Sequence, residues 1–150
     1  MRVIVLVENT SISKDYKSKH GLCLYIETKK HKLLFDLGSN SLFLENAVKL
    51  GVNITDIDSV IISHGHNDHG GALKYFLENN AKANIYISRY AFEEYYANFL
   101  GMKWNVGLDR KLKDHPRIIL IEDEYVIDEE LQIFSNIEEH LYLPTAVSYT

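Results

Sequence analysis

The chain has 150 residues, 46% of them hydrophobic and 25% charged, and a formal net charge of −5. This length and apolar content predict one globular domain over residues 1–150. The negative charge, without any basic cluster, argues against nucleic acid or an anionic membrane as a partner. Cys23 is the only cysteine, which excludes an internal disulfide, fits a reducing compartment and favours a small core residue.

The amino-terminal segment predicts a strand rather than a targeting signal. Val3–Val7 is a continuous apolar run, which is typical of a buried strand. This run is too short for a signal peptide, and no later one approaches the roughly 20 residues of a membrane span. We therefore expect a cytoplasmic protein without a membrane partner.

A loop and a hairpin are expected next. Residues 9–20 are polar and predict a loop, and apolar alternation over residues 22–28 predicts a second strand. A polar turn leads from there to a third strand over Lys32–Phe35. This turn contains His31, which we interpret as a turn residue rather than a ligand.

A helix and a central strand follow. Residues 39–41 offer N-caps for a helix that ends before Gly51. Its expected apolar face comprises Leu44, Ala47 and Val48. After a turn over residues 53–58, the β-branched run Val60–Ile62 predicts a strand that is buried on both faces.

Three histidines and an aspartate come directly after this strand. Neutral imidazole and carboxylate are ligands that zinc and similar divalent ions accept. His64 and His66 are two positions apart and are expected to reach one ion, whereas the adjacent Asp68 and His69 are better placed for a second. Two such ions, about 3.5–4 Å apart, would clamp a water molecule between them. The alternative is a polar, histidine-rich surface loop.

Two more helices and a strand are expected after this loop. Apolar residues at helical spacing predict a helix that ends at residues 79–80, and residues 85–88 predict a strand. Residues 89–100 carry an aromatic stripe that predicts a second helix ending at Gly101, and the stripe comprises Phe92, Tyr95, Tyr96 and Phe99. We interpret this stripe as core, with a tyrosine lining the pocket as the alternative.

The last third of the chain predicts a long connection and three strands. Residues 102–115 show little periodicity, as in many lids or pocket walls, and Trp104 would cover substrate or fill a gap. Strands are expected over residues 117–121, 125–127 and 131–134, and the acidic run over residues 122–130 predicts a solvated hairpin.

Several of these segments resemble a known family. His64–Gly71 resembles the signature of the metallo-β-lactamase-fold hydrolases, and Leu34–Gly38 resembles the strand-end motif that precedes it. Val7–Thr10, His20–Leu22 and Ser88–Phe99 resemble the branch that contains the archaeal methanopterin-pathway phosphoribosyl-aminobenzoate synthase and uncharacterised bacterial relatives. The resemblance implies an α/β (α+β) fold, the metallo-β-lactamase-like αββα sandwich. This chain would supply mainly the first β-layer and its helices.

The resemblance also implies roles for individual residues. Asp36 would accept hydrogen bonds that fix the segment carrying the four candidate ligands, residues 63–70, which we call the metal loop. The alternative is that Asp36 caps a turn. His64 and His66 would hold the first of two Zn²⁺ ions, with Mn²⁺ or Fe as other choices. Asp68 and His69 would hold the second ion. Asp68 is also the catalytic candidate, orienting the nucleophile or accepting its proton.

Part of the family's metal site is not accounted for. A third histidine, an acidic bridging ligand and a last histidine lie in the later half of the family's fold. His140 and His115 are weak candidates for the third histidine. We therefore expect the chain to be the N-terminal portion of a longer enzyme, inactive or weak alone, with an uncovered sheet face that could form a homodimer.

The expected function is that of a metal-dependent hydrolase or a related transferase. A metal-bound hydroxide would attack an ester, thioester or phosphoester small molecule, whose identity the sequence does not reveal. One alternative is an incomplete, non-catalytic module that binds a metal or a partner. Another is a mononuclear-iron oxygenase of the same fold.

Overall fold

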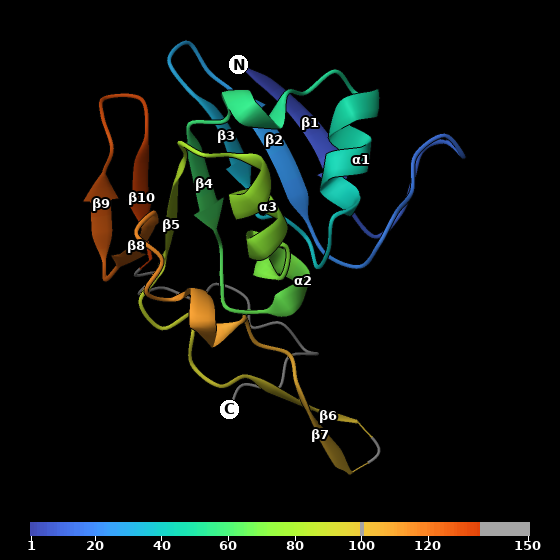
Figure 1. Ribbon diagram of the computed structural model, residues 1–150, viewed down its shortest axis with the longest axis vertical. Helices are drawn as coiled ribbons and strands as arrows, with labels where there is room; N and C mark the ends of the chain where they lie inside the picture. The colour runs from blue at the N-terminus through green and yellow to red at the C-terminus, as the bar shows by residue number, and fades with distance from the viewer. Residues whose placement is uncertain (100, 136–150) are drawn as a thin grey trace, which may run out of the picture.

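A six-stranded mixed sheet is the frame of the computed structural model, which describes residues 1–99 and 101–135 (Figure 1). The first three strands in spatial order are antiparallel neighbours, and the last four run parallel to one another. The loops that follow the parallel strands therefore gather at one edge of the sheet, which we call the carboxyl edge. In spatial order the strands are β1 (Arg2–Val7), β2 (Cys23–Glu27), β3 (Lys32–Phe35), β4 (Ser59–Ile62), β5 (Asn84–Ser88) and β8 (Ile118–Ile121).

Short helices and two hairpins complete the described fold. In Figure 1, helices α1 and α3 lie on one side of the sheet, and hairpin β9–β10 lies on the other. The helices are α1 (Leu42–Lys49), η1 (Ile54–Asp56), α2 (Asn67–Gly70), α3 (Leu73–Asn79) and η2 (Arg110–Leu112). The hairpins are formed by β6 (Tyr96–Phe99) with β7 (Met102–Asn105) and by β9 (Glu124–Val126) with β10 (Gln132–Phe134).

The two faces of the sheet differ in what covers them. Leu34, Val60 and Ile85 are adjacent across β3, β4 and β5, and all three are fully buried in the core that α1 and α3 complete. Tyr86 lies on the opposite face, where its ring centroid is 5.3 Å from that of Tyr125 on β9. Alternation along each strand thus directs one set of side chains to the helices and the other toward β9–β10.

Most of the expected strands are present, including the β2–β3 and β9–β10 hairpins, and so are the helices before Gly51 and before Asn80. Two details of burial were predicted wrongly. Val3 and Val5 are each 50% exposed, because β1 is an edge strand, so only the end of the run is buried. Val48 is 80% exposed, because α1 turns a different face to the core, namely Leu42, Phe43, Asn46 and Ala47.

The expected helix over residues 89–100 is wrong. The chain turns after β5 and then forms β6, which pairs with β7 from Tyr96↔Asn105 to Phe99↔Met102. Gly101 has φ +78 and lies in the turn between the two strands, a conformation that glycine adopts without steric cost. The aromatic spacing fits a helix, but long-range pairing with residues 102–105 decides the outcome.

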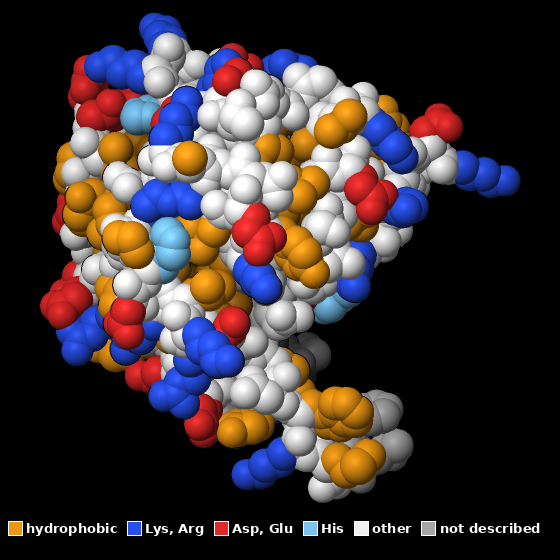
Figure 2. Space-filling view, in the orientation of Figure 1, with side chains coloured by type: hydrophobic (Ala, Val, Ile, Leu, Met, Phe, Trp, Pro, Cys, Tyr) orange, Lys and Arg blue, Asp and Glu red, His pale blue; other side chains and the backbone are white. Residues whose placement is uncertain are grey.

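Hairpin β6–β7 projects from the body of the molecule (Figure 1), and hydrophobic side chains gather on it in Figure 2. Trp104 is 57% exposed there, so the expectation that it fills a gap is wrong. Cys23 is fully buried, as predicted. Within the described residues, no helix has the length and apolar character that a membrane span requires.

Candidate metal centre

The loop after β4 brings three potential metal ligands together at the carboxyl edge. Helix α2 makes a single turn, in which the amides of His69 and Gly70 donate to the carbonyl of His66. That turn carries the chain back toward the end of β4, so one ligand atom each from His64, Asp68 and His69 lies within 4.8 Å of the others. The sequence pattern placed these residues on one loop, and the helical turn determines which of them meet.

Asp36 is the buried support of this group. It lies directly after β3, its exposed fraction is 0%, and its φ of +57 is unusual for a residue other than glycine. Its Oδ1 accepts the amide of Ser63 at 2.8 Å, and its Oδ2 accepts the Ser63 hydroxyl at 2.8 Å and His69 Nδ1 at 2.7 Å. Asp36 therefore ties Ser63 and His69 to the end of β3, and its role beside a bound metal ion stays a prediction.

The hydrogen bonds select one tautomer for each of two histidines. Because the Ser63 hydroxyl gives its only proton to Asp36, it can only accept from His64 Nδ1, which lies 2.9 Å away. His69 likewise donates its Nδ1 proton to Asp36. Both rings, when neutral, therefore present the lone pair of Nε2, the form in which imidazole binds a metal ion.

The same contacts shift the pKa values of the two rings in opposite directions. The hydrogen bond to Asp36 is the main reason that the pKa of His69 is raised, and it outweighs the opposing effect of burial. The pKa of His64 is lowered, chiefly by burial and then by the neighbouring His69 and His66 rings. Neighbouring titratable groups with divergent pKa values are characteristic of functional sites.

The donor set fits a divalent cation. His69 Nε2 lies 3.5 Å from Asp68 Oδ2, so a lone pair faces a carboxylate when the imidazole is neutral. Two such acceptors repel each other unless a proton or a metal ion lies between them. Neutral imidazole nitrogens and carboxylate oxygens are also the nitrogen and oxygen ligands that zinc binds in proteins.

His66 lies next to His64 but is not one of the three residues whose ligand atoms lie within 4.8 Å of one another. Its ring centroid is 4.7 Å from that of His64 and 5.3 Å from that of Tyr95, edge to face in both cases. Tyr95 also lines the cavity next to His64, so the alternative interpretation of the aromatic stripe applies to this tyrosine. The pairing of His64 with His66 on a first ion, and of Asp68 with His69 on a second, stays a prediction.

His20 also contacts this group, although the residue patterns in the sequence do not predict it as a site residue. Its Nε2 lies 3.2 Å from Asp68 Oδ2, while Asn9 Oδ1 lies 3.0 Å from its Nδ1. Gly21 has φ +125, and a Cβ there would lie 2.0 Å from the Asp68 carbonyl oxygen, so only glycine allows this approach. The sequence feature that pointed to His20 was the resemblance of His20–Leu22 to the synthase branch of the family.

The two weaker histidine candidates have different outcomes. The carbonyl of His115 accepts the amide of Ile118, which places His115 at the start of β8. This is the sheet edge opposite the metal loop, so His115 is wrong as a third ligand. His140 lies outside the described residues.

A cavity of about 470 Å³ adjoins the loop. It lies on the sheet face opposite the helices, and His64, Ser63 and Gly65 form part of its wall. Tyr86 and Ser88 contribute from β5, and residues 132–135 contribute from β10 and the residue after it. A small molecule in this cavity would meet His64 directly.

Comparison with known proteins decides the family. The sequence profile of the metallo-beta-lactamase superfamily matches residues 19–147. The chain belongs to this superfamily. An uncharacterized protein of Methanocaldococcus jannaschii, MJ0448, is 32% identical over an alignment of 132 residues, which covers 85% of this chain and 50% of that protein.

Solved structures show the same fold. Tm1679, a metal-dependent hydrolase of the beta-lactamase superfamily, matches with a TM-score of 0.66 and 26% identity, over 88% of this chain and 46% of that one. A quorum-quenching N-acyl homoserine lactone lactonase matches with a TM-score of 0.55 and 19% identity, over 75% of this chain and 49% of that one. The chain therefore has an α/β metallo-β-lactamase-like fold, and it spans about half the length of these relatives.

Proposed function

We propose that this chain supplies the N-terminal, metal-binding half of a metal-dependent hydrolase or related transferase that acts on an ester, thioester or phosphoester small molecule. The observation that carries the proposal is the group of His64, Asp68 and His69, whose ligand atoms lie within 4.8 Å of one another. Tm1679, whose fold this chain shares, is a metal-dependent hydrolase.

The residues of this chain prepare the site for cations. Asp36 and Ser63 hold the Nδ1 atoms of the two histidines, so that the Nε2 lone pairs are available for metal ions. His64 and His66 would serve one ion, and Asp68 and His69 a second. Bound divalent ions, with zinc the first choice before manganese or iron, supply a water of lowered pKa and polarise the scissile group.

Asp68 would orient the nucleophile or accept its proton. Its carboxylate faces two imidazoles, at 3.2 Å from His20 Nε2 and 3.5 Å from His69 Nε2. A hydrogen bond from His20 Nε2 would fix the direction of this carboxylate, which is what a positioned base requires. His20 would therefore act as a positioning residue for Asp68.

The later half of the fold would supply what the described residues do not. We propose that the third histidine and the acidic bridging ligand come from that half, because the chain spans about half of its relatives. The same half would cover the sheet face that carries Val3 and Val5, with a homodimer as the alternative. The finer resemblance to the phosphoribosyl-aminobenzoate synthase branch favours a phosphorylated substrate.

The test combines metal binding with turnover. Zinc titration by calorimetry and hydrolysis of generic phosphodiester and thioester substrates, with Zn²⁺ or Mn²⁺ added, would be measured for the natural protein and for His69→Ala. We expect metal-dependent turnover that His69→Ala abolishes, with His115→Ala as an unaffected control.

Three other results would contradict parts of this proposal. Metal binding without turnover in the full-length protein would favour a non-catalytic module. Iron content with oxygen uptake would favour a mononuclear oxygenase. Two tightly held ions per monomer in the 150-residue chain would contradict the need for further ligands.

A further inference from the structure

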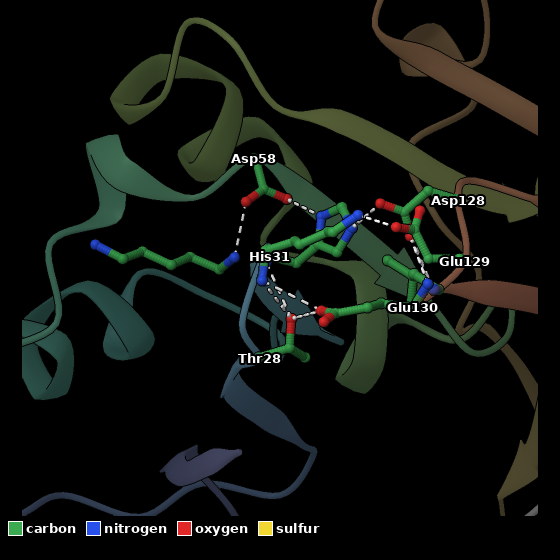
Figure 3. Close-up of polar contacts among 9 residues, drawn as sticks. Thr28, His31, Asp58, Asp128, Glu129 and Glu130 are labelled. Carbon is green, nitrogen blue, oxygen red and sulfur yellow. Dashed lines mark hydrogen bonds and ion pairs between the residues drawn. The ribbon is translucent and has the colours of Figure 1, made fainter.

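A second histidine network lies at the edge of the sheet opposite the metal loop. His31, in the turn between β2 and β3, exposes only 13% of its side chain. Its Nδ1 is 3.3 Å from Asp58 Oδ1, just before β4, and its Nε2 is 3.0 Å from Asp128 Oδ2, in the β9–β10 turn. Figure 3 shows the imidazole between the two carboxylates, which approach it from different elements.

We propose that His31 is a protonation-dependent clamp that fixes hairpin β9–β10 to the six-stranded sheet. The reason is the number of protons on the ring. An imidazolium donates from both nitrogens, whereas a neutral imidazole donates from one and presents a lone pair at the other. With a carboxylate at each nitrogen, only the protonated ring satisfies both contacts, and deprotonation leaves one carboxylate facing a lone pair.

Both carboxylates accept hydrogen bonds from backbone amides, so neither can rotate away from His31 without losing those hydrogen bonds. Asp58 Oδ2 accepts the amide of Lys32 at 2.7 Å. Asp128 Oδ1 accepts the amides of Glu130 at 2.8 Å and Leu131 at 3.1 Å. The free oxygen of each carboxylate is therefore directed at His31, and the clamp joins two rigid turns.

The surrounding charges are mostly acidic, which favours a cation at this position. From the hairpin, Glu129 pairs with the ammonium of Lys30, and Glu130 accepts the hydroxyl of Thr28 and the amide of Lys30. From the segment before β4, Asp56 pairs with Lys32 at 3.2 Å. Lys30 and Lys32 are thus already matched by other carboxylates, which leaves His31 to balance Asp58 and Asp128.

The direction of the pKa shift agrees with this geometry. Burial by itself lowers the pKa of His31, but the hydrogen bonds to Asp128 and Asp58 outweigh burial, and the pKa is raised. A raised pKa in the folded protein means that the clamp is complete below the ordinary histidine pKa of about 6.5. Its contribution is lost as the pH rises through the higher pKa of the folded state.

The clamp matters for the metal centre because the hairpin forms part of the same cavity. Residues 132–135 line the cavity that His64 also lines, and Tyr125 of β9 contacts Tyr86 on the sheet face. Release of the turn at Asp128 would loosen this wall and widen access to the cavity. This consequence for access rests on the proposed function, whereas the clamp itself does not.

The test measures the hairpin directly, without metal or substrate, so its failure is separate from failure of the proposed function. NMR would follow the His31 ring protons and the Tyr86–Tyr125 contact from pH 5 to pH 9. Hydrogen exchange, corrected for the intrinsic effect of pH, would follow the Ile127 amide, which donates to Leu131 in the hairpin. An isolated two-stranded hairpin is at best marginally stable, so detachment exposes its amides.

We expect the corrected exchange to rise about tenfold as His31 loses its proton, which corresponds to the loss of one hydrogen bond to a charged group. His31→Ala should exchange rapidly at every pH, and His115→Ala should behave like the natural protein. Asp128→Asn is the sharper variant, because its amide can donate to a neutral imidazole while its oxygen keeps the backbone contacts. We expect Asp128→Asn to remove the pH dependence and keep the hairpin attached at high pH.

Three results would overturn the proposal. One is a His31 pKa at or below about 6.5 in the natural protein. Another is hairpin exchange that does not change while His31 titrates. The third is a His31→Ala variant in which the hairpin amides stay as protected as in the natural protein.

Discussion

Two histidine–aspartate pairs occupy opposite ends of the same two strands. At the carboxyl edge, Asp36 after β3 contacts His69 of the metal loop at 2.7 Å. At the other edge, His31 before β3 contacts Asp58 before β4 at 3.3 Å and Asp128 of the distant hairpin at 3.0 Å. Both are histidines with carboxylate partners, yet they are suited to different tasks.

The difference lies in the second ring nitrogen. His69 uses Nδ1 for Asp36, and its Nε2 is turned to the ligand group with His64 and Asp68. His31 has a carboxylate at each nitrogen, so neither is available for a metal ion. A histidine held by one carboxylate is oriented as a ligand, and a histidine held by two becomes a cross-link.

The largest expected effect comes from breaking the carboxyl-edge pair at its buried member. Asp36→Ala would leave the Ser63 amide, the Ser63 hydroxyl and His69 Nδ1 without their hydrogen-bond acceptor. We expect a loss of about 3–5 kcal/mol in the free energy of unfolding. Asp36→Asn keeps the shape and tolerates the positive φ, so it should cost less, about 1–3 kcal/mol. Urea denaturation would measure both, and an Asp36→Asn variant as stable as the natural protein would argue against a role for the charge.

The second prediction concerns the close approach of Gly21, which lies just before β2, to the metal loop. Gly21→Ala would combine a strained φ of +125 with a Cβ only 2.0 Å from the Asp68 carbonyl oxygen, and we expect a cost of about 3 kcal/mol. Gly51→Ala is the matched control, because its φ is +69 but nothing lies within 4 Å, and we expect about 1–2 kcal/mol. Zinc affinity should fall only in Gly21→Ala, and loss of affinity in Gly51→Ala would contradict the local explanation.

The third prediction separates ligands from cross-links. His64→Ala and His69→Ala should each weaken zinc binding by more than about tenfold, because each removes a donor of the ligand group. His31→Ala should leave zinc affinity unchanged, although it removes a histidine with the same type of partner. Calorimetric titration would also test His66→Ala, for which we expect weakened binding. Affinity like that of the natural protein would remove His66 from the ligand set.

The smallest expected effect is a pH-dependent change in thermal stability at the other edge. Because the pKa of His31 is raised in the folded protein, its contribution is present below about pH 6.5 and is lost above the folded-state pKa. His31→Gln should therefore lower the melting temperature at pH 5.5 by about 2–4 °C and have less effect at pH 8.5. Calorimetry at both values would decide, and a larger loss at pH 8.5 would reverse the assigned sign.

Sequence reasoning succeeded where the signal is local. The apolar runs at Lys32–Phe35 and Val60–Ile62 predicted β3 and β4, and the ligand-type residues follow β4 directly. The same reasoning failed for residues 89–100, because aromatic spacing is compatible with a helix while pairing with β7 is a long-range event. The predicted burial of Val3, Val5 and Val48 was wrong for a related reason. Whether a strand lies at the sheet edge, and which face a helix turns to the core, depends on neighbouring elements.

The sequence by itself determined the superfamily, the order of the main strands and the loop that carries the candidate ligands, because each of these is encoded within a few consecutive residues. Only the tertiary structure decided which side chains meet. It joined Asp36 to His69 across 33 positions and His31 to Asp128 across 97. The number of free nitrogens on a histidine depends on such partners, which packing brings together from distant parts of the chain.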